Sequence, residues 1–114
     1  MRKLLFFALL AAAAGLLAVF AASAPSATKV KIGDNYFVRP SGVPTVTVSK
    51  GTRVRWVWTG ESLHNVKVKR GPAKFESPSK TGGRWSKVVR ATGTYTIICT
   101  VHGGSDQKMK LVVR

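Results

Sequence analysis

The sequence has few acidic residues, little histidine and almost no cysteine. Its 114 residues include four Asp and Glu, two His and one Cys, against 19 Lys and Arg. One cysteine rules out an internal disulfide, and so few carboxylates disfavour a site of the hard oxygen ligands that Ca²⁺ and Mg²⁺ prefer. Helical periodicity over three turns is also missing beyond the N-terminal region. We find no internal repeat, no low-complexity tract and no nucleic-acid recognition motif.

The N-terminal region has the pattern of an export signal. Two basic residues, Arg2 and Lys3, precede an uncharged apolar run over residues 4–22, and small residues follow through Ala27. This predicts a signal peptide over 1–27 and one domain over 28–114. The run has 19 residues, close to the minimum for a membrane span, so an uncleaved anchor is the alternative. We expect export to the periplasm, cell surface or extracellular space.

The excess of basic residues predicts anionic partners. The formal net charge is +15, and removing Arg2 and Lys3 leaves 15 − 2 = +13 on the domain. Such a field attracts an acidic redox protein or an anionic component of the cell surface or membrane. Nucleic acid is not expected, because export removes the usual target. We expect a monomer.

Alternating apolar and polar residues predict an all-β domain. The clearest strand is 53–58, where Val54, Trp56 and Trp58 share one face. Gly51, in the turn before it, is expected to have a positive φ. About seven such strands separated by turn residues predict a β-sandwich: 28–32, 45–48, 53–58, 66–69, 85–89, 94–99 and 108–113.

The chemistry-bearing residues stand where predicted strands run into loops. Cys99 and His102 are three residues apart, and His64 lies 35 residues before Cys99. Loops at one end of a sandwich lie together, so these three side chains can meet. Thiolate and imidazole suit copper and zinc, and a closed zinc site would take Asp106 as its fourth ligand. A Cys–His hydrolase would need an activating helix or cleft and an oxyanion hole, which the sequence does not indicate.

Two motifs resemble the cupredoxin (blue type 1 copper) family, particularly its plastocyanin- and pseudoazurin-like members. They are His64-Asn65-Val66 and Gly93-Thr-Tyr-Thr-Ile-Ile-Cys99-Thr-Val-His102. The resemblance implies a Greek-key β-sandwich of eight strands, one type 1 copper and one-electron transfer. It also implies His64, Cys99 and His102 as the equatorial ligands.

The axial ligand is where the sequence departs from that family, which usually places a Met there. Counting back from Leu111 and Val113, the residues that should face inward, puts this position at Gln107. Met109 has the parity of a core residue of the last strand and is the alternative, as is a site without an axial side chain. Stellacyanin-like members use an axial glutamine, so Gln107 is chemically suitable.

These observations together predict an exported type 1 copper protein that carries single electrons between redox partners and is not an enzyme in its own right. One alternative is copper binding, delivery or resistance without electron shuttling. The other is a metal-free cationic binding module.

Overall fold

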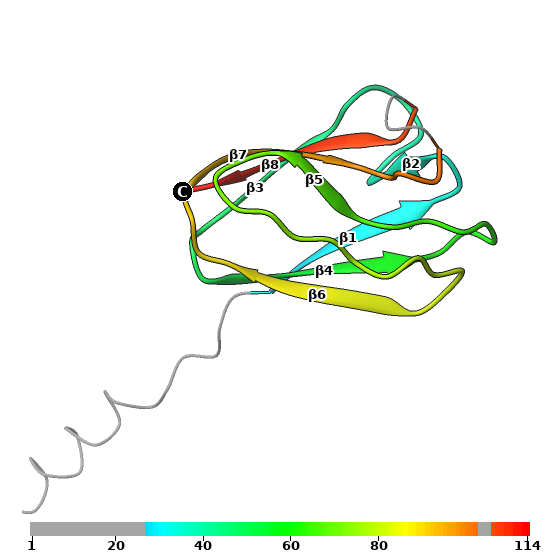
Figure 1. The fold of residues 1–114 in the computed structure, drawn as a ribbon, viewed down its shortest axis with the longest axis horizontal. Coiled ribbons are helices and arrows are strands. Elements are labelled where there is room, and N and C mark those ends of the chain that lie inside the picture. Colours follow the sequence, from blue (N-terminus) through cyan, green and yellow to red (C-terminus); the bar gives the residue numbers. More distant parts are fainter. Residues whose placement is uncertain (1–26, 103–105) are drawn as a thin grey trace, which may run out of the picture.

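The computed structural model describes residues 27–102 and 106–114. The predicted signal peptide or anchor therefore falls, apart from Ala27, outside the described residues. These residues form two four-stranded sheets that face each other (Figure 1), and none of them belongs to a helix long and apolar enough to cross a membrane. The strands are β1 (Ala27–Gly33), β2 (Tyr36–Phe37), β3 (Thr45–Val48), β4 (Thr52–Trp58), β5 (Lys67–Arg70), β6 (Arg84–Val89), β7 (Gly93–Ile98) and β8 (Lys108–Val113).

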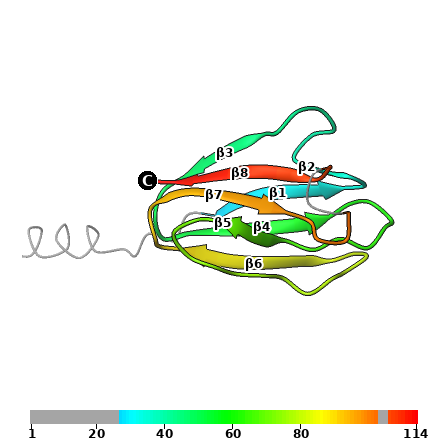
Figure 2. The same ribbon diagram turned by 45° about the horizontal axis from the view of Figure 1, so that its top comes forward.

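The chain moves repeatedly between the two sheets. One sheet has the order β2-β1-β4-β6 and the other β3-β8-β7-β5. The pairs β1–β4 and β3–β8 are parallel, and the remaining pairs are antiparallel. Only β1–β2 and β7–β8 join sequence neighbours within one sheet, so the other connections cross the sandwich, as Figure 2 shows from a second angle. The predicted all-β, two-sheet fold of seven or eight strands is confirmed.

The alternation read from the sequence decides which side chains enter the core. In β4, Val54, Trp56 and Trp58 are buried, while Arg53 is exposed. Gly51 has a φ of 87°, which confirms the positive φ expected for the turn before β4. Burying a large apolar side chain contributes about 1.5–3 kcal/mol, so this strand supplies much of the stability of its sheet.

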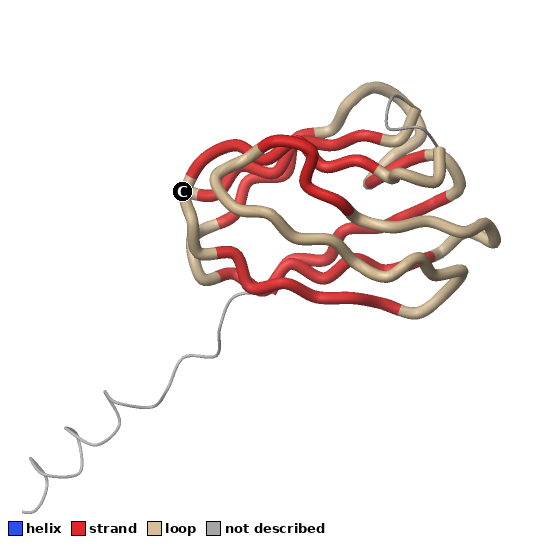
Figure 3. The backbone as a smooth tube through the Cα atoms, in the orientation of Figure 1, coloured by secondary structure: helices blue, strands red, loops and turns tan. Residues whose placement is uncertain are grey.

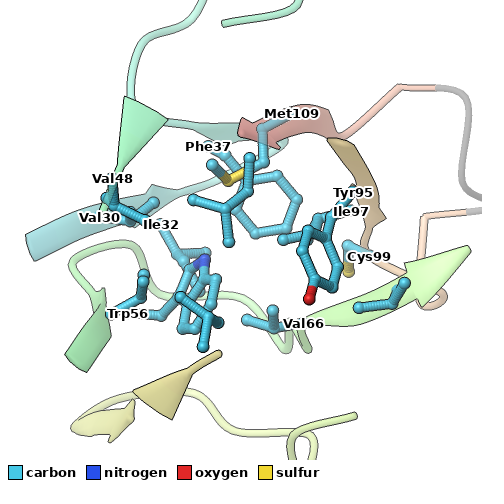
Figure 4. Packing of buried hydrophobic residues seen from close by; sticks show 14 of the residues in the cluster. Val30, Ile32, Phe37, Val48, Trp56, Val66, Tyr95, Ile97, Cys99 and Met109 are labelled. Atoms are coloured by element: carbon cyan, nitrogen blue, oxygen red, sulfur yellow. The ribbon is translucent and has the colours of Figure 1, made fainter. Parts of the chain in front are cut away.

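Both inner sheet faces contribute to one apolar core (Figure 4). Trp56 packs against Phe75 and Trp85, with ring centroids 5.9 and 5.7 Å apart. The hydroxyl of Tyr95 donates a 2.7 Å hydrogen bond to the carbonyl of Ala91. The buried hydrophobic residues are Val30, Ile32, Phe37, Val48, Val54, Trp56, Trp58, Val66, Val68, Val89, Tyr95, Ile97, Cys99, Met109, Leu111 and Val113.

The two ends of the sandwich differ. At one end lie Ala27, the β3–β4 turn and the C-terminus, which is held by Lys50 N–H donating to the Arg114 carbonyl at 2.8 Å. At the other end the chain leaves β4 and β7 and enters β5 and β8 through loops, whose described residues are drawn in tan in Figure 3. His64 and His102 belong to these loops. The fold therefore places both histidines at the end away from the described termini.

Candidate metal centre

Three side chains from two loops meet at this end of the sandwich. His64, Cys99 and His102 each offer one ligand atom, and these atoms all lie within 4.8 Å of one another. Cys99 Sγ is 3.9 Å from His64 Nδ1 and 3.6 Å from His102 Nδ1. The two imidazoles lie close together, with ring centroids 4.7 Å apart. The sequence prediction that these three residues come together is thus confirmed.

The separations fit a single metal ion held between the three atoms. Metal–sulfur and metal–nitrogen bonds of about 2.3 and 2.05 Å, set at tetrahedral to trigonal angles, place S and N about 3.6–3.8 Å apart. The two measured S···N distances lie within about 0.1 Å of this range. Asp106, the alternative fourth ligand for zinc, is not part of the cluster. One thiolate and two imidazoles, with no fourth His, Cys, Asp or Glu beside them among the described residues, suit copper better than a closed zinc site.

Hydrogen bonds to neighbouring segments hold the main chain of His64 in place. Its N–H donates to the Lys80 carbonyl, and Lys80 N–H donates back, both at 2.9 Å. Trp58 Nε1–H also donates to the His64 carbonyl at 3.0 Å. The imidazole itself is fully buried. A buried side chain on a backbone held from two sides loses little freedom when it binds a metal, which favours a preformed site.

Asn65 and Thr100 join the two ligand loops. Thr100 N–H donates to Asn65 Oδ1 at 2.8 Å, and Asn65 Nδ2–H donates to Thr100 Oγ1 at 2.9 Å. Each residue directly follows a candidate ligand, His64 or Cys99, so this pair sets the spacing between those ligands. Sequence reasoning missed the role of Thr100. Its position next to the cysteine, with an asparagine next to the histidine, was the available signal.

Asp34, which sequence reasoning also missed, contacts the far side of the His64 ring. Its Oδ1 lies 3.0 Å from His64 Nε2, and it accepts hydrogen bonds from the N–H groups of Glu61 and Ser62. The hydrogen bond with His64, followed by those from Ser62 and Glu61, lowers the pKa of Asp34 from 3.8 to about 2. The only sequence signal was an Asp in the turn Gly33-Asp-Asn35.

Gln107 lies beside Cys99 in the interior. Cys99 N–H donates to the Gln107 carbonyl at 3.2 Å, which extends the β7–β8 ladder by one pair. The Gln107 side chain is fully buried. Its Nε2–H donates to the Tyr36 carbonyl at 3.0 Å, and its Oε1 has no hydrogen-bond partner among the described residues. A buried amide oxygen left unpaired costs about 1–3 kcal/mol, so this acceptor needs an explanation.

Met109 lies two ladder pairs further along β8 than Gln107. It is opposite Ile97 and belongs to the apolar core, where Figure 4 shows it beside Phe37. This placement is the one expected from its parity with Leu111 and Val113. The choice of Gln107 as axial ligand stays a prediction, and Met109 has a packing role that needs no metal.

The three candidate ligands differ in their access to solvent. Cys99 and His64 are fully buried, whereas His102 is partly exposed. Leu63 and Val101, which precede the two histidines, are among the few exposed large apolar side chains of the described residues, at 44% each. The site is therefore closed around the thiolate and open at one imidazole, with apolar side chains next to both histidines.

Comparison with known proteins identifies solved structures of the same fold. A methionine-to-glutamine mutant of amicyanin in its Cu(I) form is 27% identical, with a TM-score of 0.64 over 78% of this chain and 83% of that chain. An oxidised proline-to-glycine mutant of amicyanin is 28% identical, with a TM-score of 0.63 over 82% and 88%.

The copper-containing nitrite reductase NirK from Thermus scotoductus SA-01 is 22% identical, with a TM-score of 0.65 over 82% of this chain but 23% of that chain. At this level of identity, the similarity to the nitrite reductase is evidence for a shared fold only. No protein-family model and no curated protein matches the sequence. The eight-stranded sandwich of this chain therefore matches the cupredoxin fold of its structural neighbours, and His64, Cys99 and His102 are arranged like a type 1 copper site.

Proposed function

We propose that this protein is an exported type 1 copper protein that carries single electrons between redox partners. The observation that carries the proposal is the convergence of one buried thiol and two imidazole nitrogens at distances that fit one ion. The similarity to copper-loaded amicyanin supports copper as that ion. When bound there, copper would supply a Cu(I)/Cu(II) couple.

The protein's own residues prepare the site for electron exchange. The backbone contacts of His64 and the Asn65–Thr100 pair hold the ligands in place. A site that cannot rearrange suits electron transfer, because less reorganisation accompanies a change in oxidation state. Cys99 is excluded from solvent, which protects the thiolate from oxidation and disulfide exchange. His102, the partly exposed ligand, is the proposed point of electron entry and exit.

Gln107 is proposed as the axial ligand. Its amide nitrogen donates to the Tyr36 carbonyl, and Oε1, at the end of the same buried side chain beside Cys99, has no partner within residues 27–102 and 106–114. An axial group tunes the potential of a Cys–His₂ copper site. An amide oxygen favours Cu(II) more than a thioether does, so the potential should be lower than with an axial Met.

The surface suits an anionic partner. The outward face of the β1–β4–β6 sheet presents Lys29, Lys31, Arg53, Arg55 and Arg84. Neither of the two ion pairs of the described residues involves any of these five. This charge would steer an acidic redox protein or an anionic surface toward the molecule. The apolar side chains beside the histidines, Leu63 and Val101, then offer a short-range contact next to His102.

Copper titration of the apo-protein tests the centre itself. Adding Cu(II) to the purified protein should produce an intense thiolate-to-copper band in the red region of the visible spectrum. The Cys99→Ser variant should remain colourless. A colourless wild-type product whose Cys99 still reacts with thiol reagents would refute the copper site.

Electron exchange separates shuttling from copper storage or delivery. Stopped-flow oxidation of the reduced protein by anionic hexacyanoferrate(III) should slow as salt is added, because screening weakens the attraction. Oxidation by the cationic tris(phenanthroline)cobalt(III) should instead speed up. Slow exchange with both reagents, together with ready loss of copper to a chelator, would favour copper delivery.

A further inference from the structure

Asp34 is the feature of this end of the molecule that the proposed function does not yet use. It lies in the two-residue turn between β1 and β2, where Ile32 pairs with Phe37 and Gly33 with Tyr36. Its Oδ1 is 3.0 Å from His64 Nε2, while the other nitrogen of that ring, Nδ1, faces Cys99 Sγ at 3.9 Å. One imidazole thus connects a carboxylate to the candidate metal position.

The carboxylate is held in place from the loop that leads into His64. Glu61 N–H lies 3.1 Å from Oδ1 and 3.2 Å from Oδ2, and Ser62 N–H donates to Oδ1 at 3.0 Å. Thr59 ties the same loop to the end of β1, with its N–H and its hydroxyl both donating to the Ile32 carbonyl. The turn and the loop therefore form one unit around the carboxylate.

Gly60 makes this arrangement sterically accessible. A Cβ at this position would lie 2.2 Å from Asp34 Oδ1 and 2.9 Å from the Asp34 main-chain nitrogen. A side chain there would displace the turn or the loop. The Asp34 carboxylate therefore has a close main-chain neighbour at Gly60 and hydrogen bonds with Glu61 N–H, Ser62 N–H and the His64 ring. These contacts indicate that the fold holds the carboxylate at this position, and that its contact with the ring is not incidental.

We infer that Asp34 is a positioning residue of the metal centre, an inference that rests on the proposed copper function. By accepting the Nε2 proton of His64, it selects the tautomer whose Nδ1 lone pair is free for the metal. Its negative charge, relayed through the ring, also makes His64 a stronger donor and favours the more positive oxidation state. Because His64 is fully buried, loss of the carboxylate would leave Nε2–H without this acceptor.

A purely structural role is the competing explanation. In that case Asp34 would only cap the N–H groups of Glu61 and Ser62, and the ring contact would follow from the loop. The two roles differ in what the charge does. A cap works nearly as well with a neutral amide oxygen, whereas the donor strength of His64 depends on the negative charge.

The test compares Asp34→Asn and Asp34→Ala with a matched control, Glu61→Gln. Asp34→Asn keeps an acceptor oxygen for the loop and removes the charge. Glu61→Gln removes the same charge from the adjacent loop, but the Glu61 carboxylate takes part in neither ion pair of the described residues. Cu(II), Cu(I) and Zn(II) affinities are measured by chelator competition, and the potential by voltammetry.

Asp34→Asn should weaken Cu(II) and Zn(II) binding by about 10-fold or more, as for other partners of metal-bound imidazoles. Cu(I) binding should weaken less. Each tenfold fall in the ratio of Cu(II) to Cu(I) affinity raises a one-electron potential by about 59 mV. Glu61→Gln should change the affinities less than twofold. The inference would be overturned if Asp34→Asn and Glu61→Gln changed the metal affinities and the potential equally, or if Asp34→Asn kept the wild-type affinities and potential.

The metal-free protein gives a second readout. Nitrogen-15 NMR of the His64 ring at neutral pH should show the Nε2–H tautomer in the wild type and a mixture in Asp34→Ala. An unbiased tautomer in the wild type would overturn the inference. Failure of the wild type to bind copper would refute the proposed function, and the tautomer measurement would still decide the role of Asp34. If copper binds normally to all variants, only the inference about Asp34 fails.

Discussion

The Asn65–Thr100 pair should be a main source of stability for the metal end of the fold. Asn65→Ala removes two hydrogen bonds of 2.8 and 2.9 Å that join the His64 and Cys99 loops. Each such bond contributes about 1 kcal/mol net, so we expect the free energy of unfolding of the apo-protein to be about 2 kcal/mol lower in the variant than in the wild type. For a domain of this size, 1 kcal/mol shifts the melting temperature by roughly 4–8 °C. The expected fall is therefore roughly 8–16 °C.

The assay is urea and thermal unfolding of the metal-free protein, followed by tryptophan fluorescence. Thr100→Ser is the matched control, because it keeps both the backbone N–H and a hydroxyl and should stay within about 0.5 kcal/mol of the wild type. A loss below about 0.5 kcal/mol in Asn65→Ala, or an equal loss in Thr100→Ser, would refute the view that this pair holds the two loops together.

Three further predictions concern the interior and the turn at Asp34. Gln107→Met should raise the potential measured by voltammetry, since a thioether stabilises Cu(II) less than an amide oxygen, and an unchanged potential would argue against an axial Gln107. Met109→Ala should lower the free energy of unfolding by about 2–5 kcal/mol through a core cavity yet retain the copper colour, whose loss would contradict a packing role. Because the pKa of Asp34 is depressed from 3.8 to about 2, its stabilising effect is complete above pH 3.8 and disappears as the pH falls toward 2. Denaturation of the apo-protein across this window should show less pH dependence in Asp34→Asn than in the wild type.

The sequence was sufficient to predict the fold and the meeting of His64, Cys99 and His102, for a physical reason. Period-two alternation, as in Val54, Trp56 and Trp58, directly reports which face of a strand is buried. A strand that ends at a cysteine or histidine places that side chain at one end of the sandwich, so His64, Cys99 and His102 could be brought together without coordinates. The parity argument likewise placed Met109 in the core, where the structure has it.

The contacts that surround the ligands were not predictable in the same way. Asp34 is 30 residues from His64 in sequence, and their contact depends on how the β1–β2 turn meets the loop at Gly60. Such a contact follows from loop geometry, and loops lack the periodicity from which strands are read. The Asn65–Thr100 pair likewise depends on two loops meeting 35 residues apart.

The two ends of the described chain lie at the same end of the sandwich, so linking the protein to a surface through either of them sets its orientation on that surface. Ala27 is paired with Arg53 beside the β3–β4 turn, and Arg114 is bonded to Lys50 of that same turn, so both ends lie opposite the ligands (Figure 1). The six residues of β8 separate the two ends of the sandwich by about 20 Å. A protein linked to an electrode through either end would hold His102 outward, toward a soluble partner. Linking it through a new thiol near Val101 would turn the proposed electron-exchanging end toward the electrode. The difference in current between the two orientations would then test whether electrons enter and leave at His102.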